Sequence, residues 1–169
     1  NPKKPHLCNG FTLGSHGAYF ENRTSTKNIQ FPYGSYSGHF CLGIIYDRTD
    51  GATIDETKPH RIDELQSISS VVRNFQFFVT EKWKIASDKG GSGNTANIGS
   101  INNIADIIAG RGMFSKLGEN WFDEYWMNYQ KITIQDGKGG TRKITTLREF
   151  VEYKNGDISL VINKRNGEK

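Results

Sequence analysis

The chain has 169 residues, a length that predicts one domain with a core of its own. Its formal net charge of +4 and sequence pI near 9.0 permit an acidic partner such as nucleic acid. No stretch approaches the roughly 18 apolar residues of a membrane span, and an aromatic content of 12% argues against a disordered chain. We therefore expect a globular protein with no membrane partner.

The chain ends and the cysteines bear on the origin of the protein. The sequence begins with Asn rather than Met, so we expect a processed product or a fragment of a longer protein, and we favour a fragment. We expect it to fold as a single domain over residues 1–169 with loose ends at 1–5 and 164–169. Cys8 and Cys41 stand in no motif of a metal site or a nucleophile. Two cysteines make no disulfide framework, so we expect reduced thiols and a cytoplasmic protein.

The first strong elements lie in the middle of the chain. His39 to Asp47 is the most apolar run, with the length and β-branched content of a buried central strand. Asp50-Gly51 signals a hairpin turn, after which residues 52–58 return as a second strand. Residues 61–72 have the spacing of a short helix or turn.

Residues 75–101 contain the most informative stretch. It opens as a strand in which Phe75, Phe77 and Val79 face one way while the intervening residues face the other. A short segment with Lys82, Trp83 and Lys84 follows, and then a polar, glycine-rich run from Lys89 to Asn97. Such a loop between two apolar segments is typical of a recognition element on a scaffold. It is also typical of a flexible hairpin turn, and both interpretations stay open here.

The C-terminal half alternates short helices and strands. Helices are expected at 102–108, 119–129 and 147–153, and strands at 131–135, 141–146 and 158–163. The aromatic residues of 119–129 recur at helical spacing, which predicts a core stripe. Together the elements predict an α/β (α+β) fold with a central mixed β-sheet flanked by short helices.

The chemistry of the polar loop favours nucleic acid. Amide side chains carry donors and acceptors for base edges, while lysine and arginine supply charge for phosphates. Tryptophan adds a surface on which a base stacks. The candidate DNA-binding residues are Lys82, Trp83, Lys84, Lys89, Ser92, Asn94, Asn97, Ser100 and Arg111.

A candidate catalytic centre lies in the predicted hairpin. Strand alternation places the two side chains of Glu56-Thr57-Lys58 on one face, and Asp50 precedes them. Metal-dependent nucleases use carboxylates to hold Mg²⁺ and a lysine to stabilise the developing charge. We therefore name Asp50, Glu56 and Lys58 as candidate catalytic residues, with Asp50 and Glu56 as the metal ligands.

These segments give the chain a family resemblance. Residues 39–101 resemble the C-terminal part of type II restriction endonucleases of the PD-(D/E)xK superfamily. The resemblance rests on the strand HFCLGIIYD, the segments TIDETK, RIDELQSI and EKWKIASD, and the loop GSGNTANIGSI. That family carries an acidic and lysine site on a central mixed sheet and inserts polar loops into the grooves of DNA. The resemblance implies Mg²⁺-dependent cleavage of double-stranded DNA by a homodimer. It also implies phosphate contacts from the basic residues and base contacts from Asn94 and Asn97.

The sequence departs from the family pattern at one point, and this leaves alternatives open. The family's Asp…(Asp/Glu)-x-Lys centre lies either upstream of Asn1 or in a degenerate form at Glu56 and Lys58. In the first case this chain alone would bind DNA without cutting it. A non-catalytic nucleic-acid-binding module is thus one alternative. A carbohydrate- or peptide-binding domain with Trp83, Trp121 and Trp126 as platforms is another.

If Asn94 reads a base, then Asn94→Ala removes a bidentate contact and relaxes the choice of DNA sequence, at a cost of about 1–3 kcal/mol against the preferred site. The measurement is the ratio of affinities for specific and random duplexes. An unchanged ratio in Asn94→Ala would contradict the base-reading role.

Overall fold

The computed structural model describes residues 4–15, 35–49, 57–91, 97–137 and 139–162. The chain divides into two compact units. Unit 1 contains Asn1–Cys41 and Thr80–Lys169, and unit 2 contains Leu42–Val79. Among the described residues, no helix is both long enough and apolar enough to cross a membrane.

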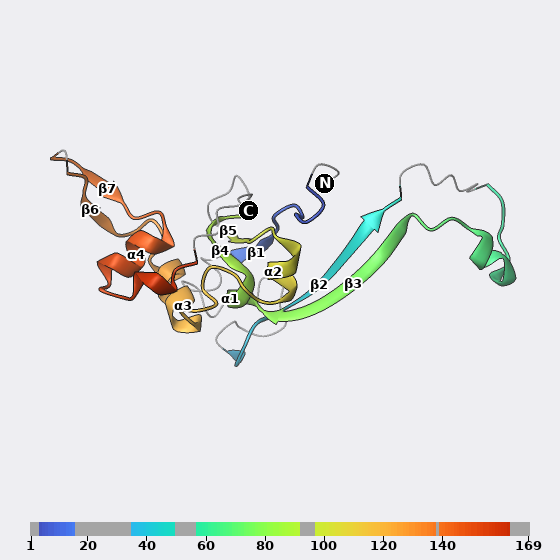
Figure 1. The fold of residues 1–169 in the computed structure, drawn as a ribbon, viewed down its shortest axis with the longest axis horizontal. Helices are drawn as coiled ribbons and strands as arrows, with labels where there is room; N and C mark the ends of the chain where they lie inside the picture. Colours follow the sequence, from blue (N-terminus) through green and yellow to red (C-terminus); the bar gives the residue numbers. More distant parts are fainter. Residues whose placement is uncertain (1–3, 16–34, 50–56, 92–96, 138, 163–169) are drawn as a thin grey trace. The chain divides into compact units, whose positions relative to one another are not determined.

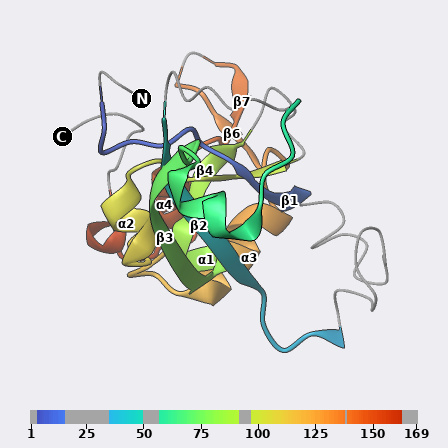
Figure 2. The same cartoon turned by 90° about the vertical axis from the view of Figure 1, so that its right-hand side faces the viewer.

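The main feature of unit 2 is a two-stranded ribbon. It is formed by β2 (Phe40–Arg48) and β3 (Val72–Glu81), which lie side by side in Figures 1 and 2. A short 3-10 helix, η3 (Ile62–Ser67), lies between them in the sequence. Among the described residues, the strand that pairs with β2 is β3. Only the last two residues of the strand predicted at 52–58 are described, and they are not in a strand. Thr57 and Lys58 form a turn and a bend, while 50–56 lie outside the described residues.

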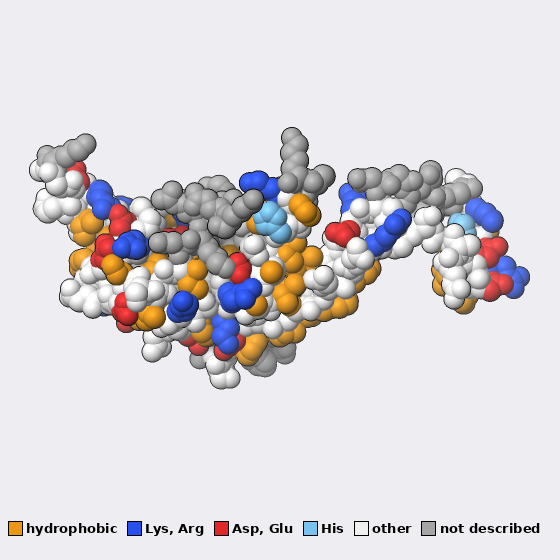
Figure 3. All heavy atoms as spheres, in the orientation of Figure 1, with side chains coloured by type: hydrophobic (Ala, Val, Ile, Leu, Met, Phe, Trp, Pro, Cys, Tyr) orange, Lys and Arg blue, Asp and Glu red, His pale blue; other side chains and the backbone are white. Residues whose placement is uncertain are grey.

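The strand over residues 39–47 was expected to be buried, and this expectation is wrong. Alternate side chains of β2 are exposed, among them Leu42 and Ile44. The alternation predicted for β3 is confirmed, because Phe75, Phe77 and Val79 share one side, but that side is also exposed. Hydrophobic side chains gather along the ribbon in Figure 3. Strand periodicity is thus a property of the sequence, whereas burial requires a second layer over the strand.

Unit 1 is built on a three-stranded antiparallel sheet. Its order is β1 (Thr12–Ser15), β5 (Asn97–Ser100) and β4 (Ala86–Gly90). One helical turn, α1 (Lys82–Ile85), leads directly into β4, and α2 (Ile104–Ile108) follows β5. The apolar residues Ile85, Ile98 and Ile107 of these elements are fully buried and form part of the core.

The aromatic stripe of α3 (Glu119–Met127) fills much of the remaining core, as its spacing predicts. Phe122, Tyr125 and Trp126 are buried. The ring of Phe114 meets Phe122 edge-on with centroids 5.4 Å apart, and it also contacts Tyr125 at 5.6 Å. Trp126 is completely buried, so it is not a platform for a carbohydrate or peptide.

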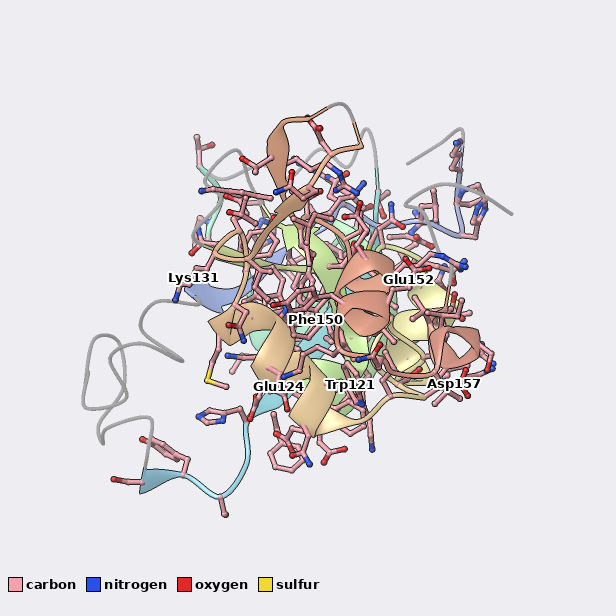
Figure 4. The ribbon with its side chains drawn as sticks, turned by 90° about the vertical axis from the view of Figure 1, so that its left-hand side faces the viewer. Trp121, Glu124, Lys131, Phe150, Glu152 and Asp157 are labelled. Atoms are coloured by element: carbon pink, nitrogen blue, oxygen red, sulfur yellow. The ribbon has the colours of Figure 1, made fainter. Side chains whose placement is uncertain are left out.

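Helix α4 (Leu147–Tyr153) packs on α3, as Figure 4 shows. Trp121 and Phe150 meet edge to face at 6.2 Å, and Lys154 Nζ lies 3.0 Å from Glu124 Oε2. The strand predicted at 158–163 is wrong within the described residues. Ile158–Leu160 forms the 3-10 turn η4, because the Asp157 carboxylate accepts a hydrogen bond from the Ser159 backbone at 2.8 Å.

A third small sheet is the hairpin of β6 (Thr133–Gln135) and β7 (Thr141–Lys143), close to the predicted ranges. Small sheets with a few short helices confirm the α+β class. The described strands form three separate small sheets, of which β1-β5-β4 is the largest. Cys8 and Cys41 are free thiols, as expected.

The start of α4 offers a test of this fold. Thr146 Oγ1 accepts a hydrogen bond from Glu149 N, the usual role of an N-cap threonine. We expect Thr146→Ala to lower the free energy of unfolding by about 1 kcal/mol, measured by urea denaturation. Thr146→Ser keeps the acceptor and serves as the control. Equal stability of the alanine and serine variants would contradict the capping role.

Candidate nucleic-acid interface

The predicted recognition loop is the connection of the β4–β5 hairpin. Ala86 pairs with Ser100 and Gly90 with Ile98, and the register shifts between these pairs. Just past the end of β4, Gly91 N donates to the O atom of Asn97, the first residue of β5, at 3.0 Å. Residues 92–96, which include Ser92 and Asn94, lie outside the described residues. The structure therefore describes both arms of the loop and the hydrogen bond that joins them.

Two glycines allow the arms to approach closely. A Cβ on Gly99 would lie 2.5 Å from Lys89 O and 2.9 Å from Ser87 Oγ. A Cβ on Gly91 would lie 2.9 Å from the Cα of Gly99 and 3.0 Å from Thr12 Cγ2. Neither position has space for a side chain, so glycine is required at both by packing against backbone.

Asp88 anchors the outgoing arm to the helices behind it. Its side chain is buried, and Oδ2 accepts a hydrogen bond from Leu147 N at 3.1 Å, at the start of α4. Its backbone oxygen accepts from the hydroxyl of Tyr125 on α3 at 2.6 Å. Burial raises the pKa of Asp88, and the backbone N–H of Leu147 partly offsets this. Burial also raises the pKa of Tyr125, so its hydroxyl stays a hydrogen-bond donor.

Ser100 ties the returning arm to the N-terminal segment. Its hydroxyl accepts from Phe11 N at 3.0 Å, and its backbone N donates to Phe11 O at 2.9 Å. The side chain of Ser100 is buried, 4% exposed. The predicted DNA contact at Ser100 is therefore a hydroxyl that the protein already uses internally, where it holds β5 in place.

The basic segment before β4 is a helical turn rather than a strand. Lys84 Nζ forms an ion pair with Glu81 Oε2 across this turn and lies 5.2 Å from the centroid of the Trp83 ring. Glu81 and Lys84 lie close together because residues three apart in a helical turn share one side of it. Both charged groups stay partly exposed.

Lys82 differs from Lys84 in its surroundings. Burial lowers the pKa of Lys82 to about 8, and the nearby charge of Cys41 opposes this change. The thiol of Cys41 shows the reciprocal effect: burial raises its pKa, and Lys82 partly offsets the rise. The ammonium group of Lys82 therefore lies in poorly hydrated surroundings, where it loses its proton more easily.

Arg111 stands close to α1 although it follows α2 in the sequence. Gly112 N donates to Lys84 O at 2.6 Å, and a Cβ on Gly112 would collide with that same oxygen. The guanidinium Nε of Arg111 lies 3.1 Å from Asp106 Oδ1, and the Arg111 side chain remains 59% exposed. The backbone of Gly112, the residue after Arg111, thus lies against the backbone of Lys84.

The described DNA-binding candidates all belong to unit 1. They come from α1, β4, β5 and the turn after α2: Lys82, Trp83, Lys84, Lys89, Asn97, Ser100 and Arg111. Lys89 is exposed on its arm, and Asn97 is half-buried on the other. Lys58 belongs to unit 2.

Carboxylates suited to a metal are a separate question. Asp50 and Glu56, the predicted ligands, lie outside the described residues. In the described part of the chain, no three His, Cys, Asp or Glu side chains gather as a metal site would require. The acidic groups nearest the basic segments, Glu81, Asp88 and Asp106, are held by a cation or a backbone N–H. These residues do not fit a Mg²⁺ site.

Sequence reasoning missed the residues that hold the loop. Asp88 and Tyr125 are separated by 37 positions, and Asp88 and Leu147 by 59. The only local signal was an acidic residue that follows buried positions on a strand with a glycine-rich end. Gly99 was visible as a glycine within an apolar segment, a signal of close backbone approach.

Comparison with known proteins gives two findings. A family model described as restriction endonuclease EcoRV matches residues 1–155. The type II restriction enzyme EcoRV of Escherichia coli is 38% identical over 124 residues, which is 73% of this chain and 49% of that enzyme. The chain therefore spans about half the length of the relative that it matches.

The glycine pair generates one prediction. Gly99→Ala forces its new Cβ against Lys89 O, so the β4–β5 arms separate. We expect a loss of about 1–3 kcal/mol in the free energy of unfolding, as for other overpacked sites. Gly10→Ala is the control, since the nearest atom to its Cβ would be 4.0 Å away. Equal melting temperatures for the two variants would argue against close packing at Gly99.

The buried environment of Lys82 leads to a prediction about stability and pH. Its folded pKa of about 8 lies below the ordinary 10.5, so folding disfavours the charged form. Stability relative to Lys82→Met should rise as the pH increases from 8 to 10.5, by on the order of 3 kcal/mol. Denaturation of both proteins across this range measures the change, and Lys84→Met, at a partly exposed lysine on the same turn, is the control. A pH-independent difference for Lys82→Met would refute a lowered pKa.

Proposed function

The chain belongs to the EcoRV restriction endonuclease family, and we propose that it acts in sequence-specific cleavage of double-stranded DNA, with residues 89–100 as its contact to the DNA. The observation that carries this proposal is the anchored β4–β5 hairpin. Its arms are fixed by the Asp88 network and by the Gly91–Asn97 hydrogen bond. A loop held in this way enters a groove without first having to order its ends.

The basic residues around the hairpin supply the phosphate contacts in this proposal. Lys89 is exposed on the arm of the loop, and Lys84 is partly exposed one turn before β4. The Arg111–Asp106 ion pair uses Nε, and a guanidinium has five N–H donors. Arg111 therefore has the donors to bind a phosphate while it still neutralises Asp106. Lys82 and Trp83 lie on the same turn and complete the basic segment.

Base recognition is assigned to the amides of the loop. Asn97 stands where β5 begins, and Asn94 belongs to the segment between the arms. An amide side chain pairs with adenine N6 and N7 in the major groove. Lysines that bind phosphates do not distinguish one base from another. Ser92 is proposed as a further contact, whereas Ser100 supports the loop from within the protein.

Cleavage is proposed for the whole enzyme with Mg²⁺ as its cofactor. Asp50 and Glu56 remain the proposed ligands, and Lys58 the proposed charge-stabilising group. Lys58 lies in an exposed bend and not on a strand. The strand geometry expected for the lysine of a Glu-x-Lys element is therefore missing at Lys58. This observation favours a second candidate, in which the chain binds specific DNA and the cutting residues belong to another part of the enzyme.

The assembly and location follow from the same proposal. Enzymes that read palindromic sites gain from two-fold symmetry, so we propose a homodimer on DNA. We also propose that the protein acts in the cytoplasm, where reduced Cys8 and Cys41 are stable.

The test is incubation with mixed plasmid DNA, with Mg²⁺ and with EDTA, read on a gel. Discrete metal-dependent bands would establish a complete nuclease in this chain and direct mutagenesis to Glu56 and Lys58. A salt-dependent mobility shift without cutting would establish the second candidate. Neither bands nor a shift at low salt would refute the DNA-binding role.

Lys89→Ala tests the phosphate contact. Loss of one phosphate contact should weaken binding to all duplexes and reduce the slope of log affinity against log salt by about 0.9. The control is Lys154→Ala, which removes an exposed lysine paired with Glu124 on the α3–α4 side of unit 1. Equal slopes for the two variants would exclude Lys89 from the interface.

A further inference from the structure

One face of the β2–β3 ribbon is apolar and exposed over its whole length in unit 2. Its side chains alternate with those of the opposite face and are between 51% and 70% exposed: Leu42, Ile44, Tyr46, Phe75, Phe77 and Val79. We call this set the ribbon face. Tyr46 and Phe75 contact each other at 5.8 Å, and Phe75 stacks with Phe77 at 6.3 Å, so both strands contribute to one continuous surface (Figure 3).

The opposite face of the ribbon is different in kind. Phe78 is buried there, and its ring occupies the space that a side chain at Gly43 would need. Asn74 Nδ2 donates to Asp47 Oδ2 at 2.8 Å on the same side. The ribbon thus has one face with polar pairing and a buried aromatic ring, and one with six large hydrophobic groups open to solvent.

Such a surface requires a cover. Monomeric proteins seldom expose a continuous apolar patch of this kind unless another surface binds it. A two-stranded ribbon is also marginal by itself, because it lacks a third strand and a second layer. In the described residues, β2 and β3 pair with each other and with no further strand, so their outer edges also lack partners.

We propose that the ribbon face is the docking surface for the polypeptide that corresponds to the half of the EcoRV enzyme this chain does not match. The match covers 49% of that relative's length, so about half of the relative is not matched by this chain. A segment of that length supplies both missing parts, a strand for an outer edge and an apolar layer for the face.

A second copy of the chain satisfies fewer of these requirements. Two ribbons packed face to face cover the hydrophobic groups of both copies, but they leave the edges of β2 and β3 unpaired. The longer family polypeptide completes the sheet and covers it in one interface. A homodimer formed on DNA through another surface is compatible with this arrangement.

The probe is the unmatched segment of the E. coli enzyme, produced separately and mixed with this chain in the absence of DNA and metal. We expect association in sedimentation velocity, together with slower hydrogen exchange at the amides of β2 and β3. Because neither DNA nor metal is present, this outcome is independent of the proposed recognition and cleavage of DNA.

Variants on the two sides of one strand make the test specific. Phe77→Lys and Leu42→Lys place a charge in the ribbon face and should weaken association at least about tenfold. Gln76→Lys adds the same charge to the exposed opposite side of β3 and should leave association unchanged. Circular dichroism of each variant alone confirms that it folds.

Three results would overturn the proposal. The first is no association at high micromolar concentrations of both polypeptides. The second is association that Phe77→Lys and Gln76→Lys affect equally. The third is a stable dimer of this chain alone that Phe77→Lys dissociates, which would assign the ribbon face to a second copy.

Discussion

The carboxylate and carbonyl of Asp88 join three elements that lie far apart in the sequence. A carboxylate removed from water needs hydrogen-bond donors, and here the backbone N–H of Leu147 provides one. The hydroxyl of Tyr125 satisfies the carbonyl of the same residue. Because Tyr125 is part of the buried aromatic core, the position of β4 is fixed by that core. The polar loop takes its position from that strand.

Elements specified by local spacing could be predicted from the sequence. The helix at 147–153 agrees with α4 at both ends, and the stripe of 119–129 gave α3 together with its buried face. Alternation along 75–80 gave the two sides of β3 correctly. Alternation does not say which side receives a second layer, and the prediction of a buried strand at 39–47, made from its apolar composition, was wrong. The segment 158–163 failed for another reason, because a local aspartate hydrogen bond outweighed its β-branched composition.

The candidate interface divides in a similar way. Lysines and amides around residues 82–97 were visible because composition alone identifies groups that bind phosphates and bases. The contacts that position them were not visible, since Asp88, Tyr125 and Leu147 meet only after folding. Composition also selected Ser100 as a DNA contact, and the structure gives this residue another role. Its hydroxyl had the chemistry of a DNA contact, but the fold uses it as an acceptor for Phe11 N.

The closure of the β4–β5 hairpin separates scaffold from specificity. The bond between Gly91 and Asn97 joins backbone atoms, and the steric demand of the close approach falls on Gly91 and Gly99. Closure itself sets no requirement on the side chains of residues 92–96. If this hairpin contacts DNA as we propose, substitutions between its two arms would change the target sequence while the anchoring residues stay the same.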